Sequence, residues 1–186
     1  EDRRDKMEKR KILGLIVGIT AFIALIAGIT LAWLNWSSST KITGGSGCFD
    51  ITYTGQGFNG TLKMSSNYTG GILASATMKI SDSCSGVTGT GTLNLHTNSF
   101  KAGDTNLLTA SSALKYAVVI DDATTAAKTG TITSAGDLTV YNGFTIDGTS
   151  HTYKVYLWLD GATADSAYLG AAYSGYINAS AKQNAS

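Results

Sequence analysis

Two patterns of apolar residues divide the chain. Residues 12–40 contain no charged residue, and residues 12–34 are apolar on every face of a helix. A helix rises about 1.5 Å per residue, so this run can cross the roughly 30 Å hydrocarbon core of a bilayer. The run predicts a transmembrane helix over residues 12–36. The alternative is a buried core helix of a globular protein. An apolar run of this length without a polar stripe is longer than such a helix needs, so the transmembrane helix is favoured.

The flanking charges predict how this helix is oriented. Six of the 14 Lys and Arg residues precede the apolar run: Arg3, Arg4, Lys6, Lys9, Arg10 and Lys11. Lys and Arg stay on the cytoplasmic side, so residues 1–11 are expected in the cytoplasm and the C-terminal part outside the cell. We expect a retained single-pass anchor in the cell membrane, because a signal peptide has an apolar region of about 7–15 residues.

Small residues in the helix suggest a second use for it. Gly14 and Gly18 form a GxxxG motif, which lets two membrane helices approach closely. The alternative is that glycine is simply more frequent in membrane helices. The lipid bilayer is therefore one predicted partner, and helix self-association is a hypothesis beside it.

After a Ser/Thr/Gly-rich linker at residues 37–47, apolar residues recur with a period of two. The clearest example is residues 152–160, where Tyr153, Val155, Leu157 and Leu159 alternate with polar or aromatic residues. Such alternation predicts β-strands. The other predicted strands are residues 48–54, 60–65, 72–81, 89–97, 114–121, 128–133, 138–141, 144–147 and 170–181.

Turn-forming pairs separate or bound several of these strands. They are Asn59-Gly60, Asn142-Gly143, Asp147-Gly148 and Asp160-Gly161. Many short strands without a second long helical pattern favour an all-β domain, a sandwich or a jelly-roll-like fold, over residues 48–186. One N-terminal transmembrane helix precedes it.

The chain has two cysteines, Cys48 and Cys84, and both lie in the predicted external part. An oxidising exterior favours a disulfide between them, with two buried free thiols as the alternative. The bridge would tie the first strand to the end of the strand at residues 72–81. Two cysteines alone cannot build a four-ligand zinc site.

Composition narrows the function classes. Charged residues make up 15% of the chain, against about 25% on average, and the net charge is +1. A nucleic-acid binder would be strongly basic, so that class is excluded. The chain is also too apolar and too weakly charged to be a disordered protein.

The residue types of common catalytic sites are scarce. The two histidines, His96 and His151, lie in no known catalytic pattern, and no Glu follows Glu8. We therefore expect no enzyme activity, no catalytic residue, no metal site, no cofactor and no small-molecule substrate. The pair Asp160 and Asp165 could present carboxylates to calcium, as could Asp121-Asp122, but polar loops are the favoured interpretation.

Five Asn-x-Ser/Thr sequons are candidate glycosylation sites if the domain is exported. They begin at Asn35, Asn59, Asn67, Asn178 and Asn184.

Both ends of the chain resemble a known family. A lysine-rich start and an apolar helix ending in LAWLNW (residues 31–36) resemble the membrane-targeting region of the TasA and camelysin family. The closing stretches YKVYLWLDG (residues 153–161) and YSGYINAS (residues 173–180) resemble the C-terminus of related exported proteins of Gram-positive bacteria. The resemblance implies a jelly-roll-like β-domain that builds extracellular fibres or surface layers. The two cysteines and the retained helix depart from the family pattern, and no metal-binding motif supports a protease activity.

The leading hypothesis is a non-enzymatic structural protein of the cell surface, acting as or in an extracellular filament or matrix. Self-association is expected through strand edges, with residues 41–54 as donor; alternatively, this segment pairs within its own domain. A second hypothesis is a pilin-like subunit whose helices pack in a filament core. A third is a module that binds glycans or a host surface through Tyr141, Tyr156, Trp158 and Tyr173.

Overall fold

The structure is a computed structural model that describes residues 48–55, 57–84, 86–108 and 113–184. Within these ranges, no helix is long and apolar enough to cross a membrane. The predicted cytoplasmic segment 1–11, the predicted helix 12–36 and the linker 37–47 lie outside the described residues.

Eleven strands and two short 3-10 helices make up the described domain. In chain order they are β1 (Phe49–Thr54), β2 (Gly57–Thr61), β3 (Met64–Ser65), η1 (Tyr68–Gly70), β4 (Ile72–Ile80), β5 (Gly89–Ala102), β6 (Thr105–Asn106), β7 (Leu114–Ile120), β8 (Lys128–Thr131), β9 (Gly136–Ile146), β10 (His151–Asp160), η2 (Ser166–Tyr168) and β11 (Ala172–Gln183). The predicted all-β class is confirmed.

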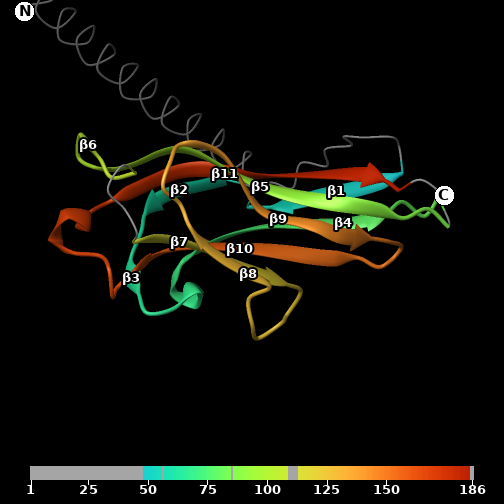
Figure 1. Ribbon diagram of the computed structural model, residues 1–186, viewed down its shortest axis with the longest axis horizontal. Coiled ribbons are helices and arrows are strands. Elements are labelled where there is room, and N and C mark those ends of the chain that lie inside the picture. The colour runs from blue at the N-terminus through green and yellow to red at the C-terminus, as the bar shows by residue number, and fades with distance from the viewer. Residues whose placement is uncertain (1–47, 56, 85, 109–112, 185–186) are drawn as a thin grey trace, which may run out of the picture. The chain divides into compact units, whose positions relative to one another are not determined.

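The strands, labelled in Figure 1, form two sheets. Sheet A has the order β1-β4-β10-β7-β8, and the short β3 pairs with β10. Sheet B has the order β2-β11-β5, after which β9 and β6 pair with different parts of β5. Neighbouring strands are antiparallel, except that β3 runs parallel to β10. The arrangement is a β-sandwich.

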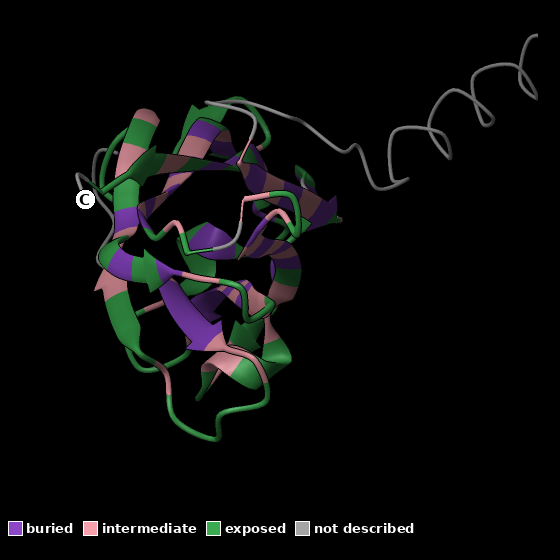
Figure 2. Ribbon diagram, turned by 90° about the vertical axis from the view of Figure 1, so that its right-hand side faces the viewer, coloured by how far each residue is buried: buried purple, intermediate pink, exposed green. Residues whose placement is uncertain are grey.

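Alternate side chains of both sheets fill one apolar core. In β1, Phe49, Ile51 and Tyr53 are buried, whereas the residues between them are partly exposed. In β5, Leu93 and Leu95 meet the core from the opposite sheet. The buried and exposed bands that alternate along the strands in Figure 2 are this period-two pattern. In β10, the predicted strand phase agrees with the observed one, because Tyr153, Val155, Leu157 and Leu159 are all buried.

The sequence pattern misplaces one boundary in β9. The pattern predicts two strands, residues 138–141 and 144–147, separated by an Asn142-Gly143 turn, whereas the structure has one strand, β9, which runs through both and ends at Ile146. Opposite them, Gly91 pairs with Phe144 and Thr92 pairs with Asn142, which leaves Gly143 as an extra residue. Gly143 has a φ of 74°, so the Asn-Gly pair forms a bulge instead of a hairpin turn.

A second boundary is wrong around Asn59-Gly60. This pair was predicted as a turn before a strand at residues 60–65, yet both residues lie inside β2 and pair with β11. The predicted strand is divided between two sheets, because β2 belongs to sheet B while Met64 and Ser65 pair with β10 in sheet A. The chain therefore changes sheets within six residues, from Gly60 to Ser65.

The outer face of sheet A carries a small apolar cluster of its own. Trp158 points away from the main core but is only 9% exposed. The ring of Tyr68, from η1, lies 6.3 Å from the Trp158 ring and 5.3 Å from the Tyr156 ring. The Tyr68 hydroxyl also donates a hydrogen bond to the carbonyl of Thr124, at 3.0 Å. Two loops are thus fastened over this face.

Close packing of glycine against aromatic rings predicts a sensitive position. A Cβ added at Gly91 would collide with ring carbons of Phe144, which packs 4.2 Å from the Tyr153 ring between the sheets. We expect Gly91→Ala to lower the free energy of unfolding by about 1–3 kcal/mol through overpacking. Urea denaturation followed by near-UV circular dichroism measures this change.

Gly148→Ala is the matched control, since a Cβ there meets no atom within 4 Å and the backbone lies outside the left-handed region. Equal denaturation midpoints for the two variants would show that Phe144 moves aside without cost.

Candidate functional site

The disulfide lies where the chain enters the β-domain. Cys48, directly before β1, is bonded to Cys84, in the loop after β4, with the two Cα atoms 5.5 Å apart. The predicted bridge is confirmed, and the alternative of two free thiols is wrong. The Ser81 N–H also donates to the Cys48 carbonyl at 2.8 Å, which continues the ladder beyond the Phe49–Ile80 pair. The bridge therefore holds the edge strand β1 against β4.

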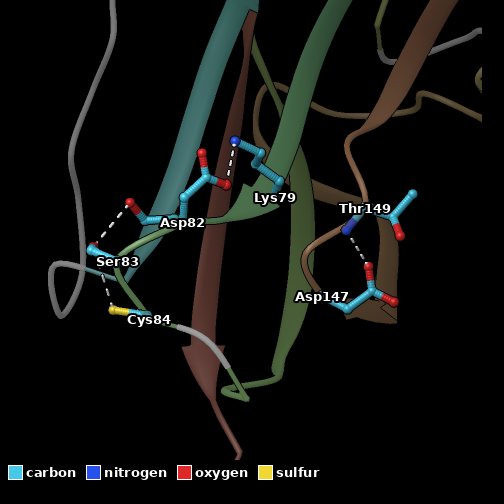
Figure 3. A network of polar contacts seen from close by, with 7 residues as sticks. Lys79, Asp82, Ser83, Cys84, Asp147 and Thr149 are labelled. Carbon is cyan, nitrogen blue, oxygen red and sulfur yellow. Dashed lines mark hydrogen bonds and ion pairs between the residues drawn. The ribbon is translucent and has the colours of Figure 1, made fainter.

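The loops beside the disulfide are held by polar contacts at the surface (Figure 3). Lys79 Nζ lies 3.0 Å from Asp82 Oδ1, and the Ser83 hydroxyl donates to the Ser81 hydroxyl at 3.3 Å. Asp147 accepts the Thr149 N–H at 2.7 Å, and this hydrogen bond lowers the pKa of the Asp147 carboxyl. Exposed contacts of this kind contribute little stability each, so their role is to order the turns.

The predicted donor segment, residues 41–54, is divided by the structure. Its second half forms β1, which pairs with β4 of the same domain through an unbroken register from Phe49–Ile80 to Thr54–Ser75. This is the intradomain alternative. Residues 41–47 lie outside the described residues. Among the strands that the structure describes, β1 pairs with β4 alone, so it is one edge of sheet A.

A tyrosine closes part of the edge of sheet B. The strand β2 ends its pairing with β11 at Gly57 and Tyr176, whereas β11 continues to Gln183. Beyond that point, the Tyr53 hydroxyl accepts the Ala179 N–H at 2.8 Å and lies 3.3 Å from the Ala179 carbonyl. Burial raises the pKa of Tyr53, while the backbone hydrogen bond to Ala179 lowers it. A side chain of sheet A thus forms the hydrogen bonds with the β11 backbone at a place where no described strand pairs with this side of β11.

Each histidine pairs with an aspartate through Nδ1. His96 Nδ1 lies 2.7 Å from Asp137, its cross-strand neighbour on the outer face of sheet B. His151 Nδ1 lies 2.8 Å from Asp121 Oδ2. Asp121 also accepts the Thr152 N–H at 2.7 Å and has a φ of 52°. The pair of His151 and Asp121 therefore links the end of β7 to the start of its neighbouring strand β10.

The aspartates that could present carboxylates to calcium form hydrogen bonds within turns and an ion pair. Asp160 accepts the Ala162 N–H at 3.1 Å, and Asp165 accepts the Ala167 N–H at the start of η2. Asp122 lies 2.7 Å from Lys154 Nζ. Across the described ranges, no three potential ligands lie close enough together to hold a metal ion. The favoured interpretation, a polar loop between the last two strands, agrees with the position of Asp160 and Asp165.

Four of the five sequons fall in described residues, and all four asparagines are exposed: Asn59, Asn67, Asn178 and Asn184. Asn59 lies in the edge strand β2 and Asn178 in β11. Asn67 precedes η1, and Asn184 follows β11. Asn35 lies outside the described residues. The exposure of these side chains makes them accessible for modification.

Of the four aromatic residues predicted to stack on sugars, Trp158 and Tyr173 are buried, and Tyr141 and Tyr156 are partly exposed. Tyr173 is 1% exposed and its hydroxyl lies 2.7 Å from that of Thr97, a buried threonine. Burial raises the pKa of Tyr173 to about 12, although the Thr97 hydrogen bond lowers it. Trp158 is covered by Tyr68, and the Tyr141 ring stacks on Phe144 at 5.2 Å. Burial therefore keeps Tyr173 and Trp158 from stacking on a sugar, whereas Tyr156 lies partly exposed on the outer face of sheet A.

The one tyrosine that is exposed, Tyr176, is not among the residues that the sequence pattern predicts for sugar binding. Tyr176 is 39% exposed on the outer face of β11, where its ring stacks on His96 at a centroid distance of 4.8 Å. The alternation of β11 carries the signal, because Tyr173, Gly175 and Ile177 are buried and Tyr176 points the other way.

No protein family model, curated protein or solved structure matches the chain.

The Asp121 contacts predict how stability depends on pH. The Thr152 N–H and then the His151 side chain lower the pKa of Asp121 below its usual 3.8. A lowered pKa stabilises the fold above pH 3.8, and this contribution is lost as the pH falls through the folded-state value. We expect Asp121→Asn, which tolerates positive φ, to flatten the fall of the melting temperature between about pH 4 and pH 2.

Asp104→Asn is the control, since Asp104 is exposed in the turn between β5 and β6. If both variants follow the parent protein over this pH range, Asp121 does not contribute to acid sensitivity.

Proposed function

We propose that this chain is a structural protein of the cell surface. Residues 12–36 anchor it as a single-pass helix with its N-terminus in the cytoplasm, and the β-domain outside serves as or in an extracellular filament or matrix. The observation that carries the proposal is the Cys48–Cys84 disulfide in a domain that follows a charge-free apolar segment. Disulfides persist in oxidising compartments, which agrees with export across the membrane.

The edges of the sheets support association between copies. The strand β1 has a straight register without a bulge, no proline and one charged residue, Asp50. In natural proteins, charged residues, prolines or bulges on an edge strand usually prevent it from pairing with another chain. By contrast, β9 in sheet B has bulges in its pairing with β5, and bulges oppose the addition of another strand. We infer that β1 is the edge at which a second copy adds a strand.

The order of the strands supports a jelly-roll-like interpretation of the sandwich. The chain passes from one sheet to the other at seven connections: β1 to β2, β2 to β3, β4 to β5, β6 to β7, β8 to β9, β9 to β10 and β10 to β11. Crossing connections of this kind are typical of double-sheet jelly rolls. The resemblance of both chain ends to the TasA and camelysin family points to the same fold and to fibre formation.

The proposed topology predicts a protease result. Protease added to intact cells should degrade the chain beyond residue 36 and leave residues 1–11 protected, because the bilayer separates the two parts. Immunoblots with antibodies against each end measure this. Protection of the β-domain in intact cells, followed by its loss after lysis, would contradict the topology.

The proposed assembly predicts the effect of a charge at the β1 edge. Thr52 lies on the outer face of β1 and is half-buried. Thr52→Lys should reduce assembly of the purified protein, since lysine on an edge strand opposes pairing with another strand. Deleting residues 41–47 should also reduce assembly if that segment contributes. Negative-stain microscopy and sedimentation measure the assembled fraction.

Thr92→Lys is the matched control, because Thr92 lies on the outer face of β5, which has a strand on each side. It should assemble as the parent protein does. A parent protein that remains monomeric at high concentration, with a folded domain, would favour an anchored monomer.

A further inference from the structure

The outer face of sheet B contains a partly exposed tyrosine ring, that of Tyr176, which one described aromatic ring covers on one side only. Tyr176 lies in β11 between His96 of β5 and Gly57 of β2. The His96 ring stacks on one side of the Tyr176 ring, with 21° between the planes. The other side of the ring faces β2, where Gly57 has no side chain to cover it. The result is an open aromatic surface bordered by a strand edge.

The Asn59 side chain lies beside this surface. Gly57 and Asn59 are exposed on either side of the buried Phe58, so their positions share the outer face with Tyr176. Asn59 pairs with Ser174 and is the diagonal neighbour of Tyr176, a spacing within reach of aromatic side chains. Asn59 Nδ2 lies 4.0 Å from the place that a Cβ on Gly57 would occupy. The amide nitrogen of Asn59 therefore lies next to Gly57, on the side of the Tyr176 ring that faces β2.

The amide of Asn59 differs from those of the other described sequons. Asn67 Oδ1 accepts both the N–H and the hydroxyl of Thr69, the sequon's own threonine. Asn184 accepts the Thr90 hydroxyl and donates to that of Thr88. Asn178 Oδ1 lies 3.5 Å from the Tyr53 hydroxyl. Within the described part of the chain, no hydrogen bond engages the Asn59 side chain, which leaves its amide available.

We propose that Asn59 carries an N-linked glycan whose first sugar packs on the open side of Tyr176. The inference rests on the proposed export, which brings the domain to a glycosylating enzyme. The Asn59 Nδ2 forms a bond to C1 of the sugar, the bond from C1 to the phosphate oxygen of a polyisoprenyl-phosphate-linked donor breaks, and Nδ2 loses one proton. The acceptor sequence is Asn59-Gly60-Thr61.

The geometry gives the sugar a defined place. A pyranose has an apolar C–H face, and aromatic faces carry partial negative charge that attracts such hydrogens. The sugar would lie above Gly57 and against the face of the Tyr176 ring that His96 does not cover. The His96 ring, stacked on the opposite face, keeps the Tyr176 ring in this orientation. Because β2 is an edge of sheet B, the glycan also covers this edge and leaves the β1 edge of sheet A for pairing with another copy.

The test uses the full chain in a yeast secretory host, with a co-expressed glycoprotein of known occupancy as positive control. Glycopeptide mass spectrometry should find a glycan at Asn59, and Thr61→Ala should remove it while leaving Asn59 in place. Enzymatic removal of the glycan should lower the melting temperature by roughly 2–4 °C. In Tyr176→Ala, occupancy should persist but this shift should disappear.

Ser180→Ala is the matched control, because it removes the sequon of Asn178 on the same outer face. The melting shift should survive in this variant. A shift that depends on Ser180 instead of Thr61 would overturn the assignment to Asn59, and an unchanged shift in Tyr176→Ala would overturn the role of the ring. A bare Asn59, with the Cys48–Cys84 bridge formed and the positive control glycosylated, would overturn the glycan while leaving the proposed export intact.

Discussion

Neither sheet of this domain can exist without the other, because each buries its apolar side chains only against its partner. The strands have one apolar face and one polar face, so an isolated sheet would expose a continuous row of residues such as Leu93 and Leu95. The aromatic rings of Phe144 and Tyr153, 4.2 Å apart, join the two sheets at this interface. The edge strand β1 has a single strand neighbour, and the disulfide compensates for this weaker hold.

The local pattern of the sequence predicts the strands well, because a period of two reports directly which side chains face the core. It predicts their connections less well. The pairs Asn59-Gly60 and Asn142-Gly143 both carry a hairpin signal, but neither forms a hairpin turn. Gly143 supplies the positive φ of a bulge, and only the register of the distant strand β5 distinguishes a bulge from a turn. Similarly, Trp158 is buried on the outer face because η1, a segment remote in sequence, covers it.

The site follows the same division. Two cysteines in a chain predicted to be exported allow one intramolecular bridge, so Cys48 and Cys84 could be paired from the sequence. The sequons are equally visible as motifs. The open side of Tyr176 is not, since it depends on the register that places Gly57 opposite this ring, with more than half of the chain between the two residues. The exposed and buried tyrosines also look alike until the strand phase of β11 is known.

Of the described strands, the last in chain order, β11, is an interior strand of its sheet. The strand β11 lies between β2 and β5, which are synthesised long before it, so sheet B has a gap until residues 172–183 have left the ribosome. Until then, the Phe58 ring lacks its neighbour Tyr173, and Leu95 lacks its cross-strand neighbour Ile177. Folding of sheet B therefore waits for β11, and a chain that lacks residues 172–183 loses the middle of a sheet, not its margin.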